Sequence, residues 1–132
     1  MSSQGSPRPV RITTFPLRDQ PGRIAAYAAA AALITLVSRR ALVEPGSVLY
    51  ETLLRTPEAA ATAARVQNYA FVFIFGAHAV EAPLFAATKL RKHGVPFLSL
   101  LWWKWVAACC LGGVAAWKHF ALTVAAAEGK RA

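Results

Sequence analysis

Two side chains in the most apolar part of this sequence have the types and the spacing for proton chemistry. His78 and Glu81 are three residues apart, so they share one face if the segment is helical. An imidazole that titrates near neutral pH beside a carboxylate can move protons, and burial tunes both groups. Gln67 lies eleven residues earlier and near the same face.

Three interpretations of this pair are open: a hydrogen-bonded polar pair that fixes helix packing, a proton-transfer site, or part of a metal site. A metal needs further ligands, and only His93, His119 and the adjacent Cys109 and Cys110 remain. We expect His93 and His119 near opposite ends of one helix, where both cannot reach the pair. We also expect the two cysteines to be apolar core residues without a disulfide. We therefore predict no metal and no cofactor, and favour the structural interpretation.

A partner for Glu81 can be predicted from helical depth. A charged side chain in hydrocarbon costs about 2.5–3.5 kcal/mol, so Glu81 needs a proton, a partner or a wet cavity. Glu81 lies eight residues before Lys89, and Lys104 lies eight residues after Pro96. In an antiparallel hairpin both lie about 12 Å below one surface. We predict that Glu81 faces Lys104 with His78 one turn deeper; alternatively, Lys104 snorkels to the surface and Glu81 pairs elsewhere.

The composition around these residues favours a membrane protein. The chain has 132 residues, of which 56% are hydrophobic and 16% charged, against about 45–50% and about 25% in soluble domains. No strand-rich block occurs, and the apolar blocks lack a polar helical face. We predict an all-α integral membrane three-helix bundle. Its single membrane domain covers 22–124, with spans at about 24–43, 66–90 and 97–120.

The segments outside the spans are predicted from proline, serine and charge. Residues 1–21 are basic and rich in proline and serine, which predicts a flexible tail. Residues 47–65 have apolar residues at helical spacing, which predicts either a short interfacial helix or a solvated loop. Residues 125–132 form a basic C-terminal tail.

Small and aromatic residues gather in the third predicted span. A stripe of small residues there favours close helix packing, with Gly76 as a candidate opposing surface, and offers a surface for other membrane proteins. It consists of Ala108, Gly112, Gly113 and Ala116. Four tryptophans are predicted to anchor the span at the two membrane interfaces: Trp102, Trp103, Trp105 and Trp117. Trp102 and Trp117 would lie about 22 Å apart along one helix.

The net charge of +9 points to a membrane surface. The basic residues flank the apolar blocks, where they meet anionic headgroups, so the lipid bilayer is the predicted partner. The aromatic residues lie inside the apolar runs and away from the basic clusters, which argues against nucleic acid. With three spans, each side of the membrane carries seven Lys and Arg residues, so the positive-inside rule is tied; Arg23 before the first span favours a cytosolic N-terminus.

At several points the sequence resembles a known family. The residues are His78-Ala79-Val80-Glu81, Lys92-His93-Gly94, Leu100-Leu101-Trp102-Trp103 and Gly112-Gly113. They are similar to the small eukaryotic "transmembrane protein 254-like" proteins over about residues 66–120. This resemblance implies a multi-span membrane protein without an assigned reaction. A weaker likeness exists to the emopamil-binding sterol isomerases and to small sterol-pathway scaffold proteins.

Two functions follow as hypotheses. The first is a non-enzymatic accessory or scaffold subunit, expected in the endoplasmic reticulum, with a mitochondrial membrane as the alternative compartment. Three short spans enclose little cavity, which favours this hypothesis over an enzyme. The second is a lipid- or sterol-transforming enzyme in which His78 and Glu81 transfer protons.

Overall fold

The chain folds entirely into helices and connecting segments within residues 6–131, the part that the computed structural model describes. The four main helices are α1 (Pro21–Ser38), α2 (Pro57–Phe85), α3 (Leu100–Gly112) and α4 (Val114–Gly129). Three short turns of helix are η1 (Arg40–Val43), η2 (Tyr50–Leu54) and η3 (Ala86–Leu90), the last of which continues α2. The predicted all-α class is confirmed.

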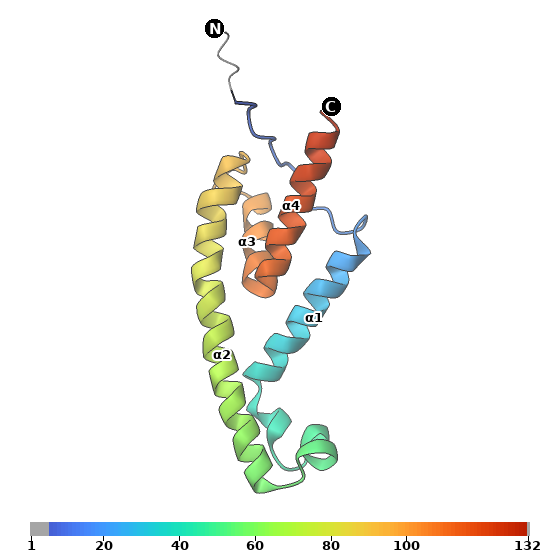
Figure 1. The fold of residues 1–132 in the computed structure, drawn as a ribbon, viewed down its shortest axis with the longest axis vertical. Coiled ribbons are helices and arrows are strands. Elements are labelled where there is room, and N and C mark those ends of the chain that lie inside the picture. The colour runs from blue at the N-terminus through green and yellow to red at the C-terminus, as the bar shows by residue number, and fades with distance from the viewer. Residues whose placement is uncertain (1–5, 132) are drawn as a thin grey trace.

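Helices α1 and α2 form a V that opens toward the end where the two chain termini lie (Figure 1). We call this the upper end and the α1–α2 connection the lower end. Near the lower end, Gln67 of α2 donates from Nε2 to the backbone oxygens of Leu36, at 2.8 Å, and Arg39, at 3.1 Å. Since the last carbonyls of a helix lack partners in their own helix, these hydrogen bonds cap the C-terminus of α1.

Helices α3 and α4 form an antiparallel hairpin in the mouth of the V (Figure 1). The predicted single helix over 97–120 is therefore wrong, because the helix ends at Gly112 and a new one starts at Val114. Gly113 between them has φ +51° and ψ −115°, a conformation that a side chain would prevent. The predicted tail 125–132 is mostly the last turn of α4.

The lower end differs from the predicted boundaries as well. Helix α1 stops at Ser38, five residues before the expected end at 43, and η1 follows. The expected interfacial segment at 47–65 is split between η2 and the start of α2. Helix α2 begins well before 66 because Pro57 occupies its first position and the Thr56 hydroxyl accepts from the Ala59 N–H.

Residues 8–20 form an extended strap across the upper end. Val10 and Ile12 are buried in the core, and the Ile12 N–H donates to the His93 carbonyl at 2.9 Å. The Arg131 guanidinium donates to the Arg8 carbonyl at 3.2 Å, which ties the C-terminus to the strap. The flexible tail predicted for 1–21 is thus wrong over this part, because the alternate apolar residues Val10 and Ile12 pack into the core. Residues 1–5 of the predicted tail lie outside the described range.

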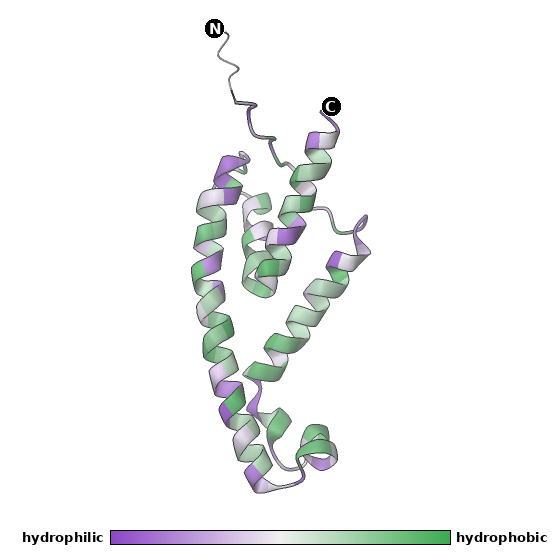
Figure 2. Ribbon diagram, viewed as in Figure 1, coloured by the Kyte–Doolittle hydropathy of each residue, from purple (hydrophilic) through white to green (hydrophobic). Residues whose placement is uncertain are grey.

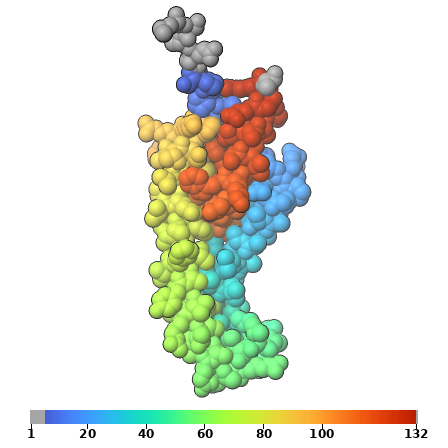
Figure 3. Space-filling model, viewed as in Figure 1, coloured from blue at the N-terminus to red at the C-terminus, as the bar shows by residue number. Residues whose placement is uncertain are grey.

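The core lies at the upper end, between the strap, the hairpin and the last turns of α2. Its largest fully buried side chains include Phe85, Trp105 and Phe120, whose rings pack at centroid distances of 4.9–6.4 Å. Hydropathy follows the long axis: polar residues gather at the two ends and apolar residues cover the shafts of α1 and α2 (Figure 2). The space-filling view shows the hairpin filling the mouth of the V (Figure 3).

The strap contributes to stability through Ile12, whose side chain is 2% exposed. We expect Ile12→Ala to lower the free energy of unfolding by about 2–5 kcal/mol, because it leaves a cavity in the core. Thr13→Ala, at an exposed neighbour, should change it by less than about 0.5 kcal/mol. Thermal unfolding of the purified chain in mild detergent measures both, and equal effects would contradict the packing of the strap.

Candidate functional site

His78 and Glu81 meet the tip of the α3–α4 hairpin. A Cβ atom added at Gly113 would lie 2.7 Å from Nε2 of His78 and 2.9 Å from Oε2 of Glu81. Both polar side chains therefore project from α2 onto the backbone of the turn, and only a glycine leaves room for them. The predicted common face of the pair is confirmed by this shared contact.

The hairpin tip explains why these two side chain types are present. Helix α3 ends there with carbonyl groups that lack helical partners, and α4 begins there with free N–H groups. The N-terminus of a helix carries a partial positive charge that favours a carboxylate such as Glu81, and the C-terminus favours a donor such as His78. The two side chains lie against the chain reversal at Gly113, where these charges and donors are favoured, which supports the structural interpretation.

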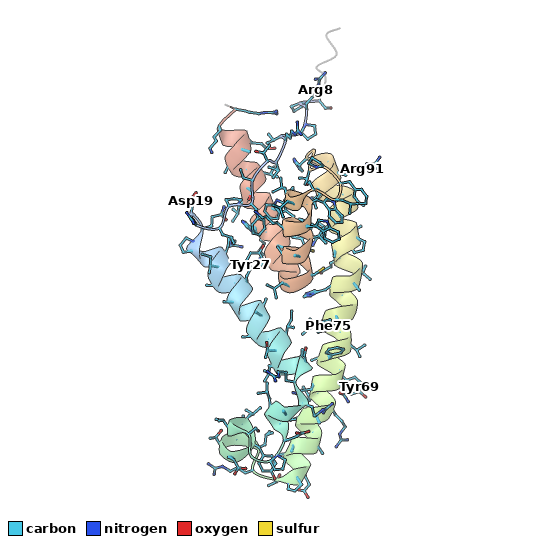
Figure 4. All side chains as sticks on the ribbon, turned by 180° about the vertical axis from the view of Figure 1, so that it is seen from behind. Arg8, Asp19, Tyr27, Tyr69, Phe75 and Arg91 are labelled. Carbon is cyan, nitrogen blue, oxygen red and sulfur yellow. The ribbon has the colours of Figure 1, made fainter. Side chains whose placement is uncertain are left out.

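The small residues of the hairpin allow close approach to α1 as well. A Cβ at Gly112 would lie 2.9 Å from Cε1 of Tyr27, so that α1 touches the turn from the side opposite α2. Figure 4 labels Tyr27 on α1 at the level of the hairpin. Ala108 and Ala116 are buried, whereas Gly76 has open space around it. The predicted contact with Gly76 is wrong, and the stripe packs within its own chain.

The predicted pairing of Glu81 with Lys104 is not formed. Lys104 is exposed and lines a groove of about 1120 Å³ between the strap and α4, whereas Glu81 lies at Gly113. The equal depths of the two residues were derived for continuous helices, and depth alone does not determine which way a side chain points. Since Lys104 lies on the side of α3 that faces the strap, it is directed away from α2.

The tryptophans do not form two interfacial belts. Trp105 is fully buried, with its ring 4.6 Å from that of Phe15 and 4.7 Å from that of His119, so its predicted role as an interface anchor is wrong. Trp103 is exposed, and Trp102 and Trp117 are half-buried. Because α4 folds back along α3, the expected 22 Å separation of Trp102 and Trp117 along one helix does not apply.

Two buried histidines hold the strap, and sequence reasoning missed this role. His93 Nδ1 donates to the Val10 carbonyl at 2.8 Å, and His119 Nε2 donates to the Pro16 carbonyl at 2.5 Å. The other nitrogen of His119 lies 2.9 Å from the Tyr27 hydroxyl. Since a carbonyl only accepts, Nε2 carries the proton, and a neutral His119 then accepts from Tyr27.

The hairpin brings His93 and His119 to the same end of the molecule, contrary to the expectation from one continuous helix. Both histidines bond carbonyls of the strap, and the His93 ring also packs 5.4 Å from the Phe120 ring of α4. Within residues 6–131, no group of three or more His, Cys, Asp or Glu residues could hold a metal ion. Both cysteines are free thiols, but only Cys109 is buried; Cys110 is exposed, so the prediction of a core position is wrong for Cys110.

Comparisons with known protein families, curated proteins and solved structures find no match to this chain. The resemblance to the transmembrane protein 254-like family therefore stays a prediction.

The contact at the hairpin tip can be tested with two glycines. Gly113→Ala should lower the free energy of unfolding by about 2–4 kcal/mol, because it strains the backbone and clashes with His78 and Glu81. Gly76→Ala, in helix α2 with nothing near its Cβ position, should be neutral or stabilising by up to about 1 kcal/mol. Thermal unfolding in detergent compares the two, and a tolerated Gly113→Ala would contradict the turn.

Proposed function

We propose that this chain is a small integral membrane protein that acts as a non-enzymatic accessory or scaffold subunit. The observation that carries the proposal is the contact of His78 and Glu81 with Gly113. It gives the two candidate catalytic groups a structural task at the turn between α3 and α4. Three cavities of the described residues are lined by other side chains, so none of these three brings a substrate to the pair.

The exposure of α1 and α2 supports a lipid environment. Helix α1, and α2 together with its continuation η3, are long and apolar enough to cross a membrane, and only 6% and 11% of their most apolar windows are buried. A core helix of a soluble protein would be mostly buried. Helix α2 exposes a row of large apolar side chains that water would disfavour, namely Tyr69, Phe71, Val72, Phe73, Phe75 and Val80. Figure 4 shows Tyr69 and Phe75 on this open shaft.

In this arrangement the α3–α4 hairpin enters and leaves the membrane from one side. Helix α3 has 13 residues, or about 20 Å of helix, which is short of the about 30 Å hydrocarbon layer. Irregular backbone at that depth persists only where protein surrounds it. The turn at Gly113 meets this condition, because Tyr27 lies against Gly112 on one side and His78 and Glu81 lie against Gly113 on the other.

The hairpin changes the charge count that sets orientation. With the C-terminus at the upper end, nine basic residues flank the membrane there: Arg8, Arg11, Arg18, Arg23, Lys89, Arg91, Lys92, Lys130 and Arg131. The lower end carries four: Arg39, Arg40, Arg55 and Arg65. The positive-inside rule then places the upper end, and both termini, in the cytosol. The proposed compartment is the endoplasmic reticulum.

The surface available to a partner also changes. The stripe of small residues in α3 is used within the chain, so a partner helix is proposed to bind the open shafts of α1 and α2 instead. The stacked rings of Phe71 and Phe75, 4.4 Å apart, lie on the shaft of α2 below the hairpin. A helix that inserted beside them would be held by packing, as is usual between membrane helices.

The orientation can be tested with glycosylation acceptor sites. A site inserted into the loop at Glu44–Ser47 should be glycosylated in cells, because the lower end faces the lumen, and sites appended to either terminus should not. Mobility on gels before and after deglycosylation measures this. If the site at the C-terminus were glycosylated and the site at the N-terminus were not, the two termini would lie on opposite sides of the membrane. That result would contradict the hairpin and support three complete spans. Imaging of a tagged chain at mitochondria would contradict the proposed compartment.

Glu81→Gln separates the scaffold from the lipid- or sterol-transforming enzyme. We expect the variant to unfold at lower temperature and to assemble poorly, since the amide loses the favourable charge at the start of α4, an effect of about 0.3–2 kcal/mol. Glu44→Gln, at an exposed position, is the matched control. Loss of a cellular lipid conversion with normal assembly and stability would support the enzyme.

A further inference from the structure

A second site of the molecule lies at the upper end of α2, and neither His78 nor Glu81 lines it. It is a groove of about 700 Å³ between the end of α2, the connection to α3 and α3 itself. Ligand pockets in proteins usually have volumes of 300–1,000 Å³ and a mostly apolar lining with few polar groups. The lining here is apolar except for Arg91: Ala82, Pro83, Ala86, Ala87, Val95, Phe97, Trp102 and Val106.

The local sequence explains why there is open space between this part of α2 and α3. Pro83 has no N–H and cannot complete the helical hydrogen-bond pattern, and the next residues, Ala86–Leu90, form a π-helical turn. Alanines at 82, 86 and 87 leave space where longer side chains would fill the gap to α3. The opposite wall is aromatic, with the rings of Phe97 and Trp102 5.2 Å apart and edge to face.

Charge is placed at only one end of the groove. Arg91 follows the π-helical turn directly, at the upper end of the molecule (Figure 4). Lys89 is engaged elsewhere, with its ammonium 5.8 Å from the centre of the Trp117 ring. Lys92 is exposed and does not line the groove. An occupant therefore needs an anionic group at the membrane surface and an apolar body that extends below it.

We propose that this groove binds one anionic glycerophospholipid, with an acyl chain along the alanines of α2 and the phosphate on the Arg91 guanidinium. The inference rests on the proposed membrane location of the chain. Basic pockets between membrane helices on the cytosolic side recognise anionic headgroups in this way. A guanidinium also suits a phosphate better than an ammonium does, because it donates two parallel hydrogen bonds. The lipid fills a gap that the chain leaves between α2 and α3.

The charge at the groove can be tested with two neighbouring basic residues. The full chain, purified in mild detergent, is incubated with palmitoyl-oleoyl phosphatidylglycerol or with the same amount of phosphatidylcholine, and bound lipid is counted by native mass spectrometry. We expect one phosphatidylglycerol to be retained in preference to phosphatidylcholine. Arg91→Gln should weaken its binding about tenfold, as expected for a lost charged hydrogen bond, and Lys92→Gln should change it less than about twofold.

A second pair of variants tests whether the apolar part of the groove holds the acyl chain. Ala87→Phe fills the groove from an exposed position and should abolish retention of phosphatidylglycerol without unfolding the chain. Ala79→Phe is the control, at an exposed position of α2 outside the groove, and should leave retention unchanged.

The possible results separate this site from the proposed function. Equal retention of the two lipids, or equal effects of Arg91→Gln and Lys92→Gln, would overturn the lipid site. If the wild-type chain nevertheless stays with vesicles through alkaline extraction, the proposal of an integral membrane protein is upheld and only the lipid site is overturned. A wild-type chain that is released from the vesicles would contradict the proposed function, whatever the lipid counts show.

Discussion

The arrangement of the helices depends on how closely the turn at Gly112 and Gly113 approaches its two neighbours. Tyr27 touches the turn from α1, and His78 and Glu81 touch it from α2. These contacts leave no volume for a side chain at either glycine. Because the turn is held on both sides, the hairpin keeps α1 and α2 apart at the upper end while Gln67 joins them at the lower end.

The strap depends on the same hairpin. Helix α4 carries His119 to a position between Tyr27 and Pro16, where its two ring nitrogens bond one residue of α1 and one of the strap. His93 makes an equivalent bond to Val10 from the connection after α2. Backbone carbonyls in an extended segment need donors when they are buried, and the two histidines supply them. The N-terminal segment thus completes the core of a small bundle.

Much of the helical architecture could be predicted from the sequence, because long apolar segments bounded by proline and charge have few alternatives to helix. The common face of His78 and Glu81 could also be predicted from their three-residue spacing, whereas their contact with Gly113 could not. The reversal at Gly113 could not, because an adjacent pair of glycines suits a close helix crossing as well as a turn. The error at Trp105 follows from that one difference, because the reversal packs His119 and Phe120 of α4 against its ring. The error at Lys104 has another cause, since depth along the helix axis does not determine the face on which a side chain lies.

The reversal also links the internal polar groups to the distribution of charge on the surface. A third complete span would carry Lys130 and Arg131 to the lower end and divide the basic residues evenly, whereas the hairpin returns them to the strap, where Arg131 bonds Arg8. The carboxylate and imidazole lie against the backbone of this turn, which has no room for a side chain at Gly113. Because the turn sends α4 back to the upper end, that end collects most of the positive charge, including Arg91 at the mouth of an apolar groove.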